Sequence, residues 1–201
     1  MENTTLYYSA FIGFFIFPIF CLLLILRGLQ LTLKKTNFSI QKQNKILLQT
    51  SFVFLFWLLL TGVLSSLGML EMNEQKPIVP PPLLVLVNIP LVILLLLVSF
   101  NNTLKQILKA TPFAWLVYFQ SFRIIVEILI WLVFIQNLLP IQMTFEGNNF
   151  DILVGIFALP IGYLVAKQNS IKIKQKLLIG WNIFGLCLLA TIISISVLSA
   201  P

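Results

Sequence analysis

Residues 83–100 read LLVLVNIPLVILLLLVSF, a run that contains no charged side chain. A helix needs about 20 mainly apolar residues to cross a hydrocarbon core of about 30 Å, and this run comes close to that length. The whole chain has the same character, since 59% of its 201 residues are hydrophobic and only 9% are charged. Soluble domains carry about 25% charged residues, so the composition predicts an integral membrane protein.

The pattern of apolar runs predicts an all-α transmembrane bundle that crosses the membrane about six times and forms a single domain over residues 1–201. The expected helices are about 6–26, 46–70, 83–100, 112–138, 151–166 and 177–198. The first run lacks a basic flank on its N-terminal side and exceeds the apolar core of a signal peptide, so we expect a retained helix. The apolar C-terminal end at Pro201 is compatible with a helix that stops at the membrane surface or with a piece of a longer protein.

Basic residues are concentrated in alternate connectors. Eleven of the 13 Lys and Arg residues lie in the first, third and fifth connectors: Arg27, Lys34, Lys35, Lys42, Lys45, Lys105, Lys109, Lys167, Lys172, Lys174 and Lys176. Cytoplasmic loops are enriched in Lys and Arg, so these connectors are predicted to be cytoplasmic and both termini to lie outside the cytoplasm. The proline-rich second connector, residues 71–82, holds only Lys76. The net charge of +7 is therefore attributed to topology and not to nucleic acid, for which no motif is present.

The residue types that are missing exclude several kinds of site. The chain has no histidine and two cysteines, Cys21 and Cys187, each inside an apolar run. Zinc or haem sites that use histidine and Ser-His-Asp catalysis are excluded, and no metal or cofactor is expected. We predict that the cysteines are small buried hydrophobic residues and not a disulfide. A paired-aspartate motif and a Gly-rich phosphate loop are also absent, which disfavours an enzyme.

Polar residues interrupt the fourth expected helix. Arg123 lies eleven residues after Pro112, which places it about 16 Å into the bilayer. Glu127 follows four residues later and Gln120 precedes by three, so the three side chains share one helix face. A charge at mid-depth is costly and is usually paired or functional, and we expect Arg123 to pair with Glu127. Two roles stay open for this stripe: a clasp between helices, or a centre that binds a substrate or ion.

The connector before the fifth expected helix, residues 143–151, reads MTFEGNNFD. An asparagine here can cap the next helix, and an aspartate in the first turn complements the helix dipole. Because residues 151–166 span only about 24 Å, the connector is predicted to enter the membrane and to bring an acidic group toward Arg123. The candidate binding residues are therefore Gln120, Arg123, Glu127, Glu146, Asn148, Asn149 and Asp151.

Small residues recur along the fifth expected helix. Ala158, Gly162 and Ala166 repeat at four-residue spacing, and Gly155 precedes them. Small side chains let the backbones of two membrane helices approach closely. We expect this ridge to be the face on which the helix packs.

The stretches QSFRIIVE, residues 120–127, and QMTFEGNNFDIL, residues 142–153, resemble a group of uncharacterised bacterial multi-pass inner-membrane proteins. The resemblance covers a minor part of the chain. It implies a location in the bacterial cytoplasmic membrane and carries no particular activity.

Three classes of function remain after these exclusions. The leading hypothesis is a small transporter or channel-like protein with a polar centre inside the membrane. The alternative is a non-catalytic scaffold or assembly partner, and a membrane-embedded lipid enzyme is the weakest. The expected partner is the lipid bilayer, with a second copy of the chain or another membrane protein left open. A cavity that reaches Arg123 would favour transport, whereas a sealed stripe would favour a scaffold.

Overall fold

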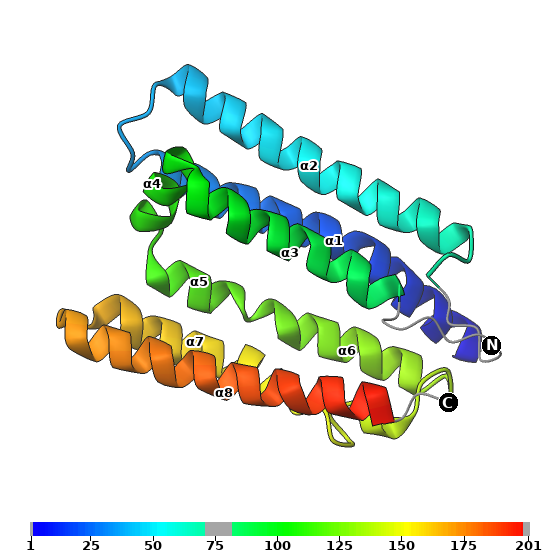
Figure 1. The fold of residues 1–201 in the computed structure, drawn as a ribbon. Coiled ribbons are helices and arrows are strands. Elements are labelled where there is room, and N and C mark those ends of the chain that lie inside the picture. Colours follow the sequence, from blue (N-terminus) through cyan, green and yellow to red (C-terminus); the bar gives the residue numbers. More distant parts are fainter. Residues whose placement is uncertain (1, 71–81, 199–201) are drawn as a thin grey trace. The chain divides into compact units, whose positions relative to one another are not determined.

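The computed structural model describes residues 2–70 and 82–198, and this described part is helical and contains no strand (Figure 1). In chain order the elements are α1 (Glu2–Leu33), α2 (Ile40–Ser66), α3 (Pro82–Phe100), α4 (Asn102–Ala110), α5 (Phe113–Phe119), α6 (Phe122–Phe134), the 3-10 turn η1 (Ile141–Met143), α7 (Asp151–Lys167) and α8 (Ile171–Leu198). The prediction of an all-α protein is confirmed. The proline-rich second connector lies almost entirely outside the described residues.

Four helices of the described part are long and apolar enough to cross a membrane, and a fifth span results if α3 and α4 are taken together. The four are α1, α2, the α5–α6 pair and α8. The axes of α3 and α4 differ by 98°, so this pair is a bent span or a re-entrant segment. The helix α7 has 17 residues, about 26 Å, which is short for a complete crossing. The expected count of six spans is therefore not confirmed.

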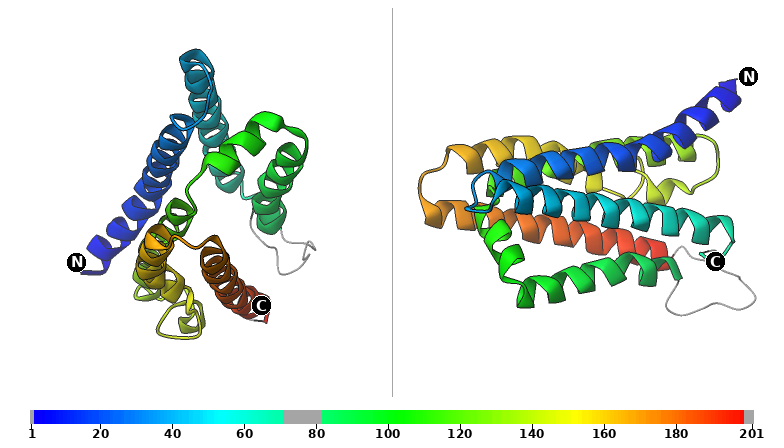
Figure 2. Two further views of the ribbon diagram at one scale, coloured as in Figure 1. Left: turned by 90° about the vertical axis from the view of Figure 1, so that its left-hand side faces the viewer. Right: turned by 90° about the horizontal axis from the view of Figure 1, so that it is seen from above.

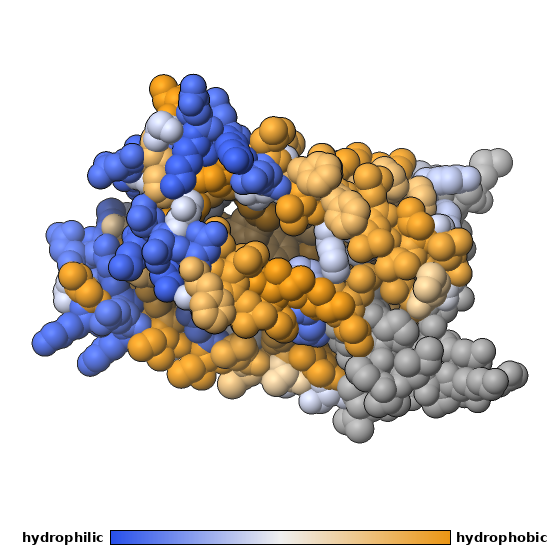
Figure 3. Space-filling model, turned by 45° about the horizontal axis from the view of Figure 1, so that its top comes forward, coloured by the Kyte–Doolittle hydropathy of each residue, from blue (hydrophilic) through white to orange (hydrophobic). Residues whose placement is uncertain are grey.

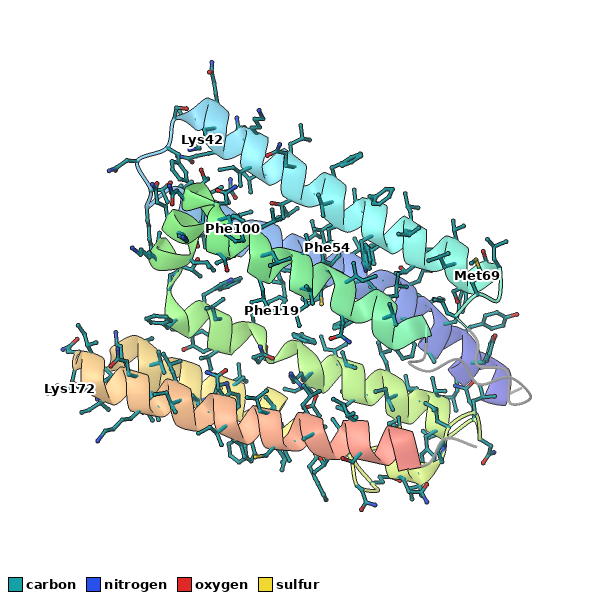
Figure 4. The ribbon with its side chains drawn as sticks, in the orientation of Figure 1. Lys42, Phe54, Met69, Phe100, Phe119 and Lys172 are labelled. Carbon is teal, nitrogen blue, oxygen red and sulfur yellow. The ribbon has the colours of Figure 1, made fainter. Side chains whose placement is uncertain are left out.

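The helix ends differ from the expected ranges in an instructive way. The helices α1, α2 and α8 continue past their apolar runs into the segments that carry basic residues, Arg27 in α1 and lysines in α2 and α8. Lys42 lies in the first turn of α2 and Met69 lies beyond its other end, whereas Lys172 lies in the first turn of α8 (Figure 4). Apolar length marks where lipid contact ends, but a helix continues for as long as its backbone bonds and caps allow. For α2 the cap is Ser39, whose side chain accepts from the backbone N–H of Lys42.

Many large apolar side chains lie on the surface of the helices. None of the residues in the most apolar 18-residue stretch of α2 is buried within the protein, and the same holds for the most apolar 18-residue stretch of α8. Figure 3 shows hydrophobic side chains along the lengths of the helices and hydrophilic ones gathered near helix ends. A helix that is apolar all round needs lipid or another protein to cover it. The surface is that of a protein inserted in a membrane.

The Cα positions divide the chain into two compact units, which are described separately. The first contains Met1–Leu24 and Pro112–Ala200, and the second contains Ile25–Thr111. The first unit has a buried cluster formed by Val117, Val154, Ala158 and Trp181. In this unit α7 packs against α5, α6 and α8, and Figure 2 shows α7 and α8 running antiparallel from the short turn that joins them.

The face of α7 that packs differs from the predicted ridge. Asp151, Gly155, Ala158, Gly162 and Val165 are buried, whereas Ala166 is exposed. An α-helix has 3.6 residues per turn, so residues spaced strictly four apart drift around the helix axis. A face that stays in contact with a neighbouring helix therefore uses spacings of three and four residues in alternation. A Cβ on Gly162 would lie 2.7 Å from the ring of Tyr118, which explains why this position is glycine.

The two cysteines have different surroundings. Both thiols are free; Cys21 is buried in the half of α1 that belongs to the first unit. Cys187 is exposed on α8, so the prediction of a buried residue is wrong for it. An apolar run in a membrane protein need not turn all its faces to the protein, because lipid can cover the rest.

Candidate functional site

A break in the fourth predicted helix positions its polar residues. The segment is continuous in sequence, yet it forms α5 and α6 with a tightened turn at Gln120 and Ser121. Here the backbone bonds join residues three apart, as in Ser121 N–H to Tyr118 C=O and Ile124 N–H to Ser121 C=O. A short 3-10 stretch inside a helix often marks a functional hinge or a strained sequence. The side-chain oxygen of Gln120 accepts from Nε of Arg123 at 3.0 Å, as the shared helix face predicted.

Arg123 forms its ion pair with Asp151, the first residue of α7. The predicted pairing with Glu127 is therefore wrong. Gly155, one turn after Asp151, explains the difference, since a Cβ there would lie 2.8 Å from the backbone nitrogen of Ile124. The missing side chain lets α7 approach α6 closely enough for Asp151 to reach the guanidinium. The expectation that the connector brings an acidic group to Arg123 is confirmed.

Glu127 is bonded by an amide and not by a cation. Its two carboxylate oxygens lie 3.1 and 2.9 Å from Nδ2 of Asn149, and that nitrogen also donates to the carbonyl of Met143 at 3.0 Å. The side-chain oxygen of Asn149 accepts from the backbone N–H of Asp151 at 3.1 Å. This last bond fixes which way the amide points, because its oxygen must face the helix and its nitrogen Glu127. Asn149 thus connects Glu127 to the start of α7.

The predicted capping of the fifth helix needs correction. Phe150 occupies the N-cap position of α7 and makes no side-chain cap bond. Asn149 still satisfies the first N–H of the helix, from one position further back. Asn148 is exposed, and it is neither the N-cap residue of α7 nor the residue that bonds the first N–H of that helix.

Glu146 lies apart from the other carboxylates. Its Oε1 accepts from the indole nitrogen of Trp131 at 2.7 Å, one helical turn beyond Glu127 on α6. The ring of Trp131 also stacks on Phe145, with centroids 6.0 Å apart. Glu146 is exposed, so this contact anchors the connector at its outer edge and does not extend into the buried residues.

We call Gln120, Arg123, Glu127, Asn149 and Asp151 the polar cluster. Glu127, Asn149 and Asp151 are buried, with Glu127 only 2% exposed. One cation and two carboxylates give the polar cluster a formal charge of −1. Oδ1 of Asp151 is buried and has no hydrogen-bond partner among the described residues. The same described part contains no group of three His, Cys, Asp or Glu side chains able to hold a metal ion.

Two positions that shape the connector between α6 and α7 were not singled out from the sequence. Thr144 is fully buried; its hydroxyl donates to the carbonyl of Ile141 at 2.9 Å, and its own carbonyl accepts from the N–H groups of Gly147 and Asn149. Asn137 has a φ of 59° and turns the chain back after α6. An asparagine followed shortly by a proline is a recognisable helix end, so the sequence did carry a signal for Asn137. No pattern pointed to Thr144.

Comparisons with protein-family models, with curated proteins and with solved structures gave no match to this chain.

Proposed function

We propose that the protein is a small multi-pass transporter or channel-like protein, and that its polar cluster takes up a proton or a small cation within the membrane. The observation that carries the proposal is the environment of Glu127. This carboxylate is buried, and both of its oxygens face the neutral amide of Asn149. Arg123, the partly buried cation of the polar cluster, is held by Asp151.

The charge balance gives the physical argument. Arg123 and Asp151 neutralise each other, which leaves the buried Glu127 without an ion pair of its own among the described residues. An unpaired charge at such a place is costly, and acidic residues within membrane helices usually belong to ion or proton pathways. A proton or a small cation on the carboxylate would remove the cost. Glu127 would then alternate between two charge states, as a coupling residue must.

The backbone around the polar cluster supports the same proposal. Transporters often form their ion sites where a membrane helix is interrupted. The tightened turn at Gln120 and Ser121 is such an interruption, and it lies next to Arg123. The connector that carries Asn149 is a second irregular segment, and it contacts Glu127 through the Asn149 amide.

A scaffold remains the second candidate because the polar cluster closes on itself. Apart from Oδ1 of Asp151, its buried side-chain atoms have partners among the described residues. Such a cluster can hold α6, the connector and α7 together without any ligand. A scaffold would require the polar cluster for stability and would conduct nothing.

A flux measurement tests the proposal. The purified full chain is reconstituted in liposomes that hold a pH-sensitive dye, and a potassium diffusion potential drives entry of protons; labelled Na⁺ is the second probe. We expect flux of one probe that Glu127→Gln abolishes and that Glu146→Gln, at the exposed edge, preserves. Absence of flux for both probes with wild-type protein, or equal loss in both variants, refutes transport through the polar cluster and supports the scaffold.

The proposal includes six crossings of the bacterial cytoplasmic membrane with both termini outside the cytoplasm. The alternation of basic connectors supports it, as does the resemblance of residues 120–127 and 142–153 to bacterial inner-membrane proteins. The helix α7 crosses fully only if the connector before it also enters the membrane. Reporter fusions at Gln41, Asn73 and Asn169 test the topology: the first and last must report cytoplasm and Asn73 the opposite side. The reverse result at any of them contradicts it.

A further inference from the structure

An apolar groove runs between α7 and α8 in the first unit. Its volume is about 550 Å³, which is within the usual range of about 300–1,000 Å³ for sites that bind small molecules. Its walls include Phe157 and Ile161 from α7 and Lys176, Gly180, Trp181 and Phe184 from α8. Lys176 is the one charged residue in the lining. The groove is thus apolar along its length, with a cation toward the start of α8.

Gly180 gives the groove its depth. A Cβ at this position would meet no atom within 4 Å, so the space beside the backbone is open. Lys176 and Phe184 are four residues before and after Gly180, and the three positions share one face of α8. The distance along the helix from Lys176 to Phe184 is about 12 Å. Ile173 also lines the groove, three residues before Lys176, so the groove is elongated along the helix and its charge lies within one turn of the end nearer the start of α8.

The surrounding charge has one sign. Lys172 and Lys174 lie in the turn of α8 before Lys176, and Lys167 ends α7 on the other side of the short connecting turn. No acidic residue follows Asp151 in the sequence. The lysine end of the groove is therefore unopposed by any acidic residue in this part of the chain, and it favours an anion.

We propose that the groove binds one acyl chain of an anionic phospholipid, with the lipid phosphate at Lys176. The occupant follows from charge and shape together: an extended apolar groove with a cation near one end matches an amphiphile with an anionic head. Basic residues beside membrane helices select anionic headgroups, and the one lysine that contacts the phosphate should contribute about a fivefold preference. This inference concerns a surface outside the polar cluster and does not depend on transport.

Trp181 provides the measurement because it lines the groove and is otherwise buried. The full chain is reconstituted in phosphatidylcholine vesicles that contain an increasing fraction of phosphatidylglycerol or phosphatidylcholine with brominated acyl chains, which quench tryptophan on contact. The contribution of Trp181 is the difference between wild type and Trp181→Phe. We expect brominated phosphatidylglycerol to quench it at about one fifth of the mole fraction that brominated phosphatidylcholine requires.

Two pairs of variants distinguish lipid binding in the groove from a general attraction of anionic lipid to the surface charge. Lys176→Gln should abolish the preference for phosphatidylglycerol, whereas Lys172→Gln, outside the lining, should keep most of it. Gly180→Leu should fill the groove and reduce quenching by both lipids, whereas Gly62→Leu, also in open space but on α2, should not. Equal quenching by the two lipids in wild type overturns the proposal. An equal effect of the two lysine variants also overturns it, because the lysines would then act as general surface charge.

Discussion

Replacing Arg123 by methionine removes the cation that Asp151 contacts. Asp151 is 7% exposed and one of its oxygens already lacks a partner in the described part of the chain, so its charge would be left buried and uncompensated. Breaking a buried ion pair from one side costs about 3–5 kcal/mol. Since the Arg123 side chain keeps 20% of its surface exposed, the lower end applies, and Arg123→Met should reduce the free energy of unfolding by about 3 kcal/mol.

A second substitution shows which carboxylate Arg123 stabilises. Adding Asp151→Asn or Glu127→Gln to Arg123→Met gives two double variants with the same formal charge at the polar cluster. A difference in stability between the two double variants therefore cannot come from total charge and must come from which carboxylate Arg123 contacts. We expect a coupling energy of about 2 kcal/mol between Arg123 and Asp151 and of less than about 0.5 kcal/mol between Arg123 and Glu127.

The assay is reversible unfolding of the purified protein in mixed micelles of increasing SDS content, followed by circular dichroism and tryptophan fluorescence. Double-variant cycles give one coupling energy for Arg123 with Asp151 and one for Arg123 with Glu127. A coupling energy with Glu127 that equals or exceeds the one with Asp151 refutes the assignment of the ion pair. A loss below about 1 kcal/mol for Arg123→Met refutes the view that the substitution leaves the Asp151 charge buried and uncompensated.

Three further predictions concern the connector and the helix contacts. Asn149→Ala removes the donor to both oxygens of Glu127 and should cost about 1–3 kcal/mol in the same SDS assay; an unchanged midpoint would contradict the bonding. Gly155→Ala should cost about 1–3 kcal/mol because its Cβ meets α6, whereas Gly62→Ala, in open space on α2, should be neutral or stabilising by up to about 1 kcal/mol; equal changes would argue against close packing. Cysteines introduced singly, in a background without the native ones, should react rapidly with a membrane-impermeant thiol reagent at the exposed Asn148 and slowly at the buried Asn149, and equal rates would indicate a solvated connector.

Much of the secondary structure follows from local sequence. Runs without charge made the helices predictable, and the expected range 151–166 differs from α7 by a single residue. The continuous helix over 112–138 was wrong, because apolar content alone does not reveal a change of backbone pattern at Gln120 and Ser121. The extension of α8 back to Ile171 was also missed, since lysines end an apolar run without ending a helix.

The sequence by itself determined which residues are polar within apolar runs, and so it identified Arg123, Glu127 and Asp151 as exceptional. Only the tertiary structure decided how they pair. Glu127 is four residues from Arg123 and Asp151 is 28 residues away, so local spacing favoured Glu127. The outcome depended on how closely two helices approach, and Gly155 permits that approach by having no side chain. An ion pair forms where the backbones bring two charged side chains close together. The distance between two helices depends on how they pack, and the spacing of residues within one helix does not predict it.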